Sequence, residues 1–224
     1  MFYKYIYTAY YAVRQIRFRK IGHHFIMATH YNSPICLDKY NTIPISQHIC
    51  CRGENTGAIY DASMKIYEVQ DFIELEVGSR KYQLLEYHFH LPCEHIVCNE
   101  HNPAEIHYVF LEEDEVGKFR RGNISPDVCG CCDTSDLAGN ILVIGRTIRH
   151  DVSEIDDLEK FPVRFPKKYF MYDGTLTTGD FAPVRWLVGR DPIYMNVLDI
   201  APIAKHARAT QNEDGRIILY VRSN

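Results

Sequence analysis

The chain has 224 residues, of which 46% are hydrophobic and 24% charged, and its formal net charge at pH 7 is −4. This length suffices for one domain with a substantial core, and the composition is that of an ordinary globular protein. The acidic balance argues against a general nucleic-acid-binding protein, whose surface is normally basic. No stretch approaches the roughly 18 consecutive apolar residues of a membrane helix, so we predict no membrane span.

Residues 1–26 differ from the rest of the chain because they are basic and aromatic and contain no acid. We predict that they form an extension outside a single folded domain at 27–224, with Met27 available as a second start. A targeting peptide for an organelle is one alternative, although such peptides are usually rich in Ser and this segment has none. A basic amphipathic element that touches a membrane or a partner is another. The default compartment is the cytoplasm.

Eight cysteines are many for a cytosolic protein. No secretory signal is visible and the chain is not small, so reduced thiols are the expectation. The run Cys129-Gly130-Cys131-Cys132 resembles half of a zinc knuckle, but it has no second pair of ligands at a useful spacing, which disfavours a second metal site. The cysteines are Cys36, Cys50, Cys51, Cys93, Cys98, Cys129, Cys131 and Cys132.

The expected secondary structure is a succession of short strands. The segment 32–45 should wrap the edge of the domain, 51–57 is turn-like, and 114–136 reads as a surface loop. Residues 152–159 fit one short helix that opens with Ser153 as N-cap. No repeat or linker interrupts the chain after residue 32, so one predominantly β domain is the consistent interpretation. Strands are predicted at 58–69, 71–77, 82–90, 104–110, 141–148, 175–188 and 216–221.

Three histidines in two of these strands form the strongest functional signal. His88 and His90 lie two residues apart, so on a strand they share one face, while Tyr87 and Phe89 share the other. Turn-forming residues then bring the strand that carries His107 back beside the first. A lone strand histidine is more often an ordinary core or surface residue than a ligand, but two on one face are costly to bury unpaired. Three converging imidazoles, with a fourth position left for water, are typical of a catalytic zinc site.

Two acidic residues strengthen the prediction of a metal site. Glu86 and Glu105 each precede a histidine by two residues and therefore share its face. Imidazoles that bind metals usually donate their other N–H to a carboxylate or a carbonyl, which fixes the tautomer and the ring orientation. Three histidines with two such acids favour a metal centre over an ordinary sheet surface.

The histidine strands and several further motifs, in the same order, resemble the α-class carbonic anhydrases. The family has counterparts, in the same order, to four further segments: Asn32–Ile35, Leu142–Gly145, Arg208 and Gly215-Arg216. The match spans roughly residues 30 to 224. Its most specific motifs are Tyr87–His90, Glu94–Val97, Ala104–Val109, Tyr172–Thr178 and Pro183–Trp186.

The resemblance implies a mainly β single domain built on a large twisted, mostly antiparallel central sheet with a few short helices. It also implies Zn²⁺ as cofactor and CO2 and bicarbonate as substrates. His88, His90 and His107 would hold the zinc. The Thr177 hydroxyl would donate to Glu94 and so orient the reactive oxygen. Thr178 matches the residue that contacts bicarbonate. CO2 carries no charge and needs a small apolar wall beside the metal, which the resemblance assigns to Val109, Val143, Leu176, Val184 and Trp186.

Four departures from the family pattern bear on activity. Glu86 stands where the family usually has an amide, and its charge is expected to raise the pKa of the zinc-bound water and to lower activity near neutrality. Ala58 stands where fast members carry a proton-shuttle histidine, which predicts slow or buffer-dependent turnover. Leu91-Pro92 replaces a Trp-Gly pair after the ligand strand. The Trp- and Gly-containing segment at the start of the family domain has no counterpart.

The sequence therefore favours a carbonic anhydrase, with a carbonic-anhydrase-related binding module of weak or no activity as the alternative. Such relatives usually lose one or more zinc ligands, whereas this chain keeps all three. A zinc hydrolase is disfavoured because Glu94 and Glu105 already have other roles, which leaves no free carboxylate as general base. An oligomer is compatible with the sequence, which does not specify one.

Overall fold

The computed structural model describes residues 32–38, 42–113, 116, 140–152, 157–178, 181 and 183–223. The basic segment 1–26, most of the predicted loop 114–136 with its cysteine run, and Ser153 lie outside the described residues. Within the described part of the chain, no helix is both long enough and apolar enough to cross a membrane.

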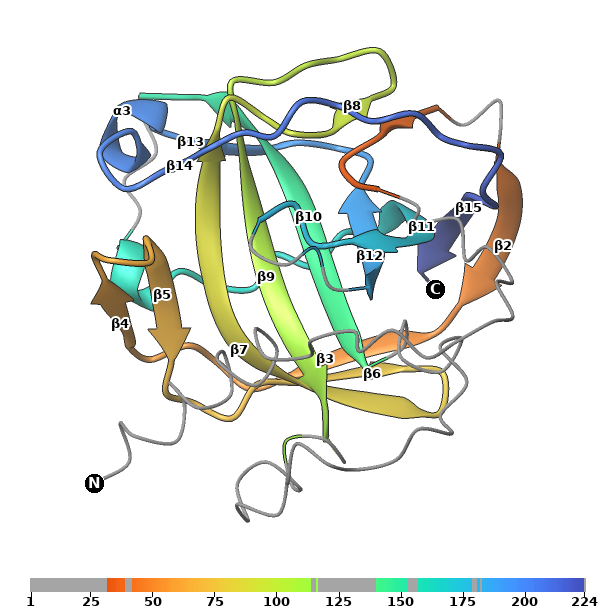
Figure 1. Cartoon of the computed structure of the whole chain (residues 1–224). Helices are drawn as coiled ribbons and strands as arrows, with labels where there is room; N and C mark the ends of the chain where they lie inside the picture. The colour runs from red at the N-terminus through yellow and green to blue at the C-terminus, as the bar shows by residue number, and fades with distance from the viewer. Residues whose placement is uncertain are drawn as a thin grey trace, which may run out of the picture.

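The fold is a single, mainly β domain, which confirms the predicted fold class. One mixed sheet of 13 strands dominates it, and its main path runs β2-β15-β11-β12-β10-β9-β7-β5-β4. The long strands β7, β9 and β10 lie side by side through the middle of the molecule (Figure 1). Most neighbouring pairs are antiparallel, whereas β10 runs parallel to both β12 and β13.

The elements are short apart from the central strands, and helix is almost absent. In chain order they are β1 (Cys36–Leu37), β2 (Ile43–Gln47), β3 (Ile49–Arg52), β4 (Ala58–Asp61), β5 (Ile66–Val69), β6 (Glu74–Val77), β7 (Arg80–Leu91), β8 (Ile96–Val97), β9 (Ala104–Glu112), β10 (Ile141–His150), the 3-10 helix η3 (Leu158–Lys160), β11 (Lys168–Thr175), β12 (Pro183–Gly189), β13 (Ile193–Met195), α3 (Val197–Ile200), β14 (Lys205–His206) and β15 (Leu219–Ser223).

The alternation of side chains along β7 separates two environments. Tyr87 and Phe89 belong to the larger hydrophobic core, and we call their side of the sheet the aromatic face. The Tyr87 ring stacks on Tyr67 of β5 at a centroid distance of 5.0 Å, and Phe89 meets Phe161 edge-on at 6.0 Å. Glu86, His88 and His90 project to the opposite side, which we call the histidine face.

Two predicted strands are interrupted by turns. The run 58–69 is a hairpin, β4 and β5, because Asp61 Oδ1 accepts hydrogen bonds from the backbone N–H groups of Ser63 and Met64, and Lys65 adopts a left-handed φ of 53°. The run predicted at 175–188 divides between β11, which ends at Thr175, and β12, which begins at Pro183. Asp61 and Ser63 in the first run and Gly179-Asp180 in the second are turn-forming residues that the strand predictions did not take into account.

The predicted helix at 152–159 and the predicted turn at 51–57 also differ from the structure. The described part of the first contains only η3, which is capped by Asp157 through a hydrogen bond accepted from the Glu159 N–H. In the second, only Cys51 and Arg52 belong to a strand, β3, which pairs antiparallel with β6, while residues 53–57 lie outside any strand, as predicted.

Candidate metal centre

The three predicted histidine ligands lie together on the histidine face. His88 of β7 and His107 of β9 are direct cross-strand partners, and His90 follows His88 on the same face. Their ligand nitrogens lie within 4.8 Å of one another. The centroid of the His90 ring is 5.0 Å from that of His88 and 4.6 Å from that of His107. All three side chains are buried, with at most 5% of the residue exposed.

Carboxylates on the same strands fix two of these rings. Glu86 Oε1 lies 3.2 Å from His88 Nδ1, and Glu105 Oε1 lies 3.0 Å from His107 Nε2. A neutral imidazole that donates one N–H to a carboxylate presents a lone pair on its other nitrogen. His88 Nε2 and His107 Nδ1 are thereby left as acceptors that face the middle of the cluster.

His90 provides the clearest sign that a metal belongs here. Both of its ring nitrogens are buried. Nδ1 lies 3.3 Å from Glu94 Oε1 and close to the His206 backbone, whereas Nε2 has no hydrogen-bond partner among the described residues. Buried polar atoms without partners are costly, so this nitrogen calls for a ligand or an ion. Three imidazole donors suit Zn²⁺ and leave one tetrahedral position open. The residues present therefore fit zinc.

The electrostatic setting favours the ligand form of the histidines. Burial lowers the pKa of His88 and of His90 well below the usual histidine value, and nearby positive groups add to the effect. Both rings are thus neutral at pH 7, as metal binding requires. Burial also raises the pKa of Glu86 to about 7, although Lys205 and His107 oppose this shift.

Glu105 is the hub of the hydrogen-bond network beneath the cluster. Its Oε2 accepts from the backbone N–H groups of Glu94, at 3.0 Å, and His95, at 2.9 Å, and from the Cys93 thiol at 3.2 Å. Its Oε1 faces the rings of His95, at 2.7 Å, and His107. Burial alone would raise the pKa of Glu105, but His95 and His107 hold it well below the usual range. The hub is therefore a carboxylate.

Gly145 leaves room for the Glu105 carboxylate because it has no side chain. Gly145 of β10 is the cross-strand partner of His107. A Cβ at this position would lie 2.8 Å from Glu105 Oε1 and 3.7 Å from the Trp186 ring. Any larger residue would therefore push against the carboxylate that orients His107.

Glu94 connects the cluster to the segment after β14. Its Oε1 accepts from the Arg208 backbone N–H at 2.7 Å and lies 3.3 Å from His90 Nδ1, while its Oε2 is buried without a hydrogen-bond partner. Burial raises the pKa of Glu94, and His107, the Arg208 N–H and the Thr177 hydroxyl oppose this. The Thr177 hydroxyl therefore lies close to a buried carboxylate that still has an acceptor free.

The residues assigned to the CO2 wall gather on the same side of the sheet. Strand register pairs Val109 with Val143, Val143 with Trp186, and Gly174 with Val184, so these side chains follow the face of His107. The Trp186 ring lies 4.8 Å from that of His107, and its Nε1–H donates to Thr175 O at 2.9 Å. The turn directly after β11 then presents the rest of the predicted set, Leu176, Thr177 and Thr178.

The position expected for a proton shuttle does not lie on the histidine face. Ala58 pairs with Val69 and packs into the core of the aromatic face. Its neighbour Ile59 pairs with Glu68, which in turn pairs with Glu86, so Ile59 takes the side of the histidines. The carboxylate of Asp61, at the end of β4, accepts hydrogen bonds within the β4–β5 turn.

Several residues of the centre were not assigned roles from sequence. The His95 ring is buried between Glu105 and the Tyr172 hydroxyl, 2.7 Å from each. Tyr172 in turn donates to Ser33 Oγ at 3.2 Å. Since both His95 nitrogens are hydrogen-bonded, the group His95, Glu105 and His107 is a positioning network and a poorer metal site than the three histidines. The signal for His95 was its place beside Glu94; Ser33 had no signal beyond its motif.

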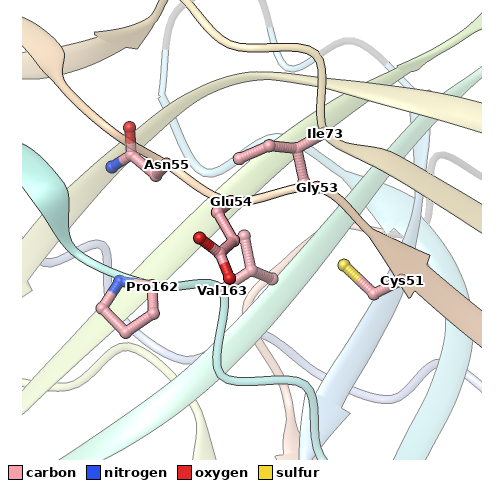
Figure 2. Close-up of a pocket in the computed structure, with 7 residues that line it drawn as sticks. All are labelled: Cys51, Gly53, Glu54, Asn55, Ile73, Pro162 and Val163. Atoms are coloured by element: carbon pink, nitrogen blue, oxygen red, sulfur yellow. The ribbon is translucent and has the colours of Figure 1, made fainter.

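A separate pocket of about 270 Å³ has no histidine in its lining, and Figure 2 shows the residues around it. Its wall includes Asn55, whose Nδ2 donates to the Tyr87 hydroxyl at 3.3 Å and to the carbonyl of Phe161 at 3.1 Å. Because Tyr87 belongs to the aromatic face, this hollow lies against the opposite side of the sheet from the metal centre. Its lining residues are Cys51, Gly53, Glu54, Asn55, Ile73, Pro162 and Val163.

Comparison with solved structures identifies the fold. The α-carbonic anhydrase from Thermovibrio ammonificans, in complex with the inhibitor sulfanilamide, superposes with a TM-score of 0.60 at 18% identity over 85% of this chain and 87% of that chain. The chain has an α-carbonic-anhydrase fold. The Photobacterium profundum α-carbonic anhydrase gives 0.60 at 17% identity, covering 86% and 90% of the two chains. Dioscorin complexed with ascorbate, of the same fold, gives 0.60 at 16%, covering 87% of each.

Sequence comparison adds nothing to this result. No protein-family model matches the chain, and no curated protein does. The similarity to the α-carbonic-anhydrase fold therefore rests on the arrangement of the sheet, and the chemistry has to be argued from the chain's own residues.

Proposed function

We propose that this protein is a zinc-dependent carbonic anhydrase, which interconverts CO2 and bicarbonate. The observation that carries the proposal is the cluster of three buried imidazoles, His88, His90 and His107, whose ligand nitrogens lie within 4.8 Å of one another. Bound zinc would supply a Lewis acid that lowers the pKa of water at the open position to near neutrality, an effect for which carbonic anhydrase is the standard example.

The carboxylates would keep the ligand rings in one orientation. Glu86 and Glu105 accept the N–H groups of His88 and His107, which holds the free nitrogens toward the same point. Positioning groups of this kind raise the basicity of the ligands and commonly change metal affinity 10- to 100-fold, an order-of-magnitude estimate.

Thr177 and Glu94 would orient the nucleophile. Glu94 is buried, and its Oε2 has no hydrogen-bond partner, so it can accept the Thr177 hydroxyl. A hydroxyl that donates to a carboxylate offers only its lone pairs to the next group. It can then accept a hydrogen bond from the nucleophilic oxygen and so fix the direction of that oxygen's lone pair.

The apolar residues beside the ligands would hold CO2 and later release bicarbonate. Val143, Val184 and Trp186 are fully buried, and they present no hydrogen-bonding group toward the histidine face. Such a wall favours a small uncharged molecule over water. Thr178, which follows Thr177, would contact bicarbonate through its hydroxyl.

Proton removal is expected to limit turnover. Each hydration releases a proton, and Ala58 supplies no titratable group and faces the aromatic core. A small buffer that diffuses to the centre should therefore carry the proton in place of a side chain. We propose slow turnover that depends on buffer concentration.

The decisive experiment combines metal analysis with a stopped-flow assay of CO2 hydration, with and without an imidazole buffer. About one zinc per chain, with hydration that rises and then saturates as imidazole is added, supports the proposal. The exposed histidine variant His48→Ala is the matched control and should behave as the wild type, whereas His107→Ala should lose both zinc and activity. Zinc binding without hydration at any buffer concentration would reject it.

A binding module with weak or no catalysis is the second candidate. Two observations favour it: a buried carboxylate, Glu86, lies against His88, and no shuttle residue occupies Ala58. A carboxylate there adds negative charge beside the metal and disfavours formation of a second anion at the centre. If this candidate holds, Glu86→Gln should leave the chain still unable to hydrate CO2; if the carbonic anhydrase proposal holds, the same change should increase the rate near neutrality.

A further inference from the structure

Lys205 lies beside the three histidines because of the way its strand pairs with β7. Lys205 of β14 pairs in parallel with His90 of β7. Paired residues in neighbouring strands project to the same side of a sheet, so Lys205 lies on the histidine face next to a ligand. A hydrogen bond from the β4–β5 turn anchors the start of β14, because Lys65 Nζ donates to the carbonyl of Ala204, the residue before Lys205, at 2.8 Å.

The histidine face around Lys205 is otherwise acidic. Glu86 is buried beside His88, Glu68 is its cross-strand partner, and Glu94 lies 3.3 Å from His90 Nδ1. Lys205 forms no direct ion pair with a described residue, so its ammonium acts on the centre through space. The electrostatic consequences agree with this placement: burial lowers the pKa of Lys205, and Glu86 and Glu94 oppose the shift.

The charges of Glu86 and Lys205 affect how strongly the centre attracts anions. When it is ionised, Glu86 adds one negative charge beside the ligand His88. An added negative charge weakens the attraction between a cationic centre and anions such as bicarbonate. One positive charge at a comparable distance restores that attraction.

We propose that Lys205 is a positioning residue of the metal centre, whose charge offsets that of Glu86 and keeps the open position attractive to anions. The inference rests on the proposed function in one respect, since it requires a metal at His88, His90 and His107. It goes further by naming a residue from a separate strand and a charge pair as part of the centre.

The test uses the cobalt-loaded full chain and thiocyanate as an anionic probe, followed through the visible spectrum of cobalt. Lys205→Met should weaken thiocyanate binding about tenfold, the scale of one charge at such a site. Lys205→Arg, which keeps the charge, should stay within about threefold of wild type on the same reasoning. Lys168→Met, at an exposed position on β11, is the control for net charge and should change nothing.

A double-mutant cycle separates charge from packing. Glu86→Gln should strengthen thiocyanate binding about tenfold, and the double variant Glu86→Gln/Lys205→Met should return to near the wild-type affinity. The proposal is overturned if Lys205→Met binds as the wild type does, or if Lys205→Arg is as weak as Lys205→Met. If Lys205→Met does not fold by circular dichroism, Glu86→Gln decides, and an unchanged affinity in that variant rejects the proposal.

The wild type distinguishes failure of this inference from failure of the proposed function. A wild-type chain that takes up no cobalt overturns both. A wild-type chain that binds cobalt and thiocyanate but does not hydrate CO2 overturns the proposed function, and the variant series still decides the role of Lys205.

Discussion

The two faces of β7 solve different physical problems with neighbouring residues. On the aromatic face, Tyr87 and Phe89 pack against other rings, and the hydrophobic effect and ring geometry hold them. On the histidine face, His88 and His90 are equally buried but are polar, and the Nε2 atom of His90 has no hydrogen-bond partner among the described residues. The first face supplies stability that the second forgoes. Such a division is expected where a functional centre is built into a rigid sheet.

The largest expected effect is on the histidine face. His90→Ala removes one of three ligands, and two imidazoles should not retain the ion. Metal analysis after dialysis should show zinc falling from about one per chain to near zero, and CO2 hydration should be lost. The apoprotein should remain folded because His90 does not belong to the hydrophobic core. Full zinc content in this variant would show that the three histidines are not the metal site.

A substitution on the aromatic face should lower the stability of the fold and leave metal binding intact. Phe89→Ala leaves a cavity between Tyr67, Tyr87 and Phe161 and should cost about 3–5 kcal/mol of unfolding free energy. Urea unfolding monitored by circular dichroism measures this cost. Folded protein should still bind zinc stoichiometrically, and Phe89→Leu should lose less stability. Loss of zinc from folded Phe89→Ala would mean that the two faces are not independent.

A smaller effect is expected at the carboxylate hub. Glu105→Gln keeps the size but replaces one acceptor oxygen with a donor that opposes the N–H groups around it. Zinc affinity, measured by competition with a chelator, should fall about 10- to 100-fold. Glu100→Gln changes an exposed carboxylate that contacts Arg149 and serves as the control. Equal affinity in the two variants would remove Glu105 from the support of His107.

The smallest expected effect is on how the stability of the aromatic face depends on pH. Asp71 accepts from the backbone N–H of Thr56 at 2.6 Å, next to Asn55, which holds the Tyr87 hydroxyl. The Thr56 N–H lowers the pKa of Asp71 below its usual 3.8, so its contribution is present above that value and is lost as pH falls through the lowered pKa. Asp71→Asn should be modestly less stable at pH 7 and indistinguishable from wild type at about pH 2. A constant difference in urea midpoint across this range would contradict the assignment.

Local pattern was enough to predict some features of this protein. The i, i+2 spacing of His88 and His90 specified one shared face, because side chains alternate along any strand. The apolar neighbours Tyr87 and Phe89 specified the other face for the same reason. The predominantly β character followed from the number of short β-branched and aromatic runs. These features depend on residues within a few positions of one another.

Other features depended on which distant segments become neighbours. Lys205 lies beside His90 because β14 pairs with β7, and no local signal in residues 201–208 pointed to that pairing. Ala58 faces the aromatic core because of its register with Val69, although its motif suggested the other side. The predicted strand 175–188 is divided because β12 reverses direction to pair antiparallel with β11.

The sequence by itself therefore determined the periodicity of β7 and β9 and the residue types that could bind a metal. Only the tertiary structure decided which groups surround those ligands. Glu94 is hydrogen-bonded to the backbone of Arg208, and His95 lies between Glu105 and Tyr172. Lys205 lies on the histidine face beside His90. The physical reason is that alternation is set by the geometry of a single strand. Strand pairing and register are set by the free energy of burying the whole sheet.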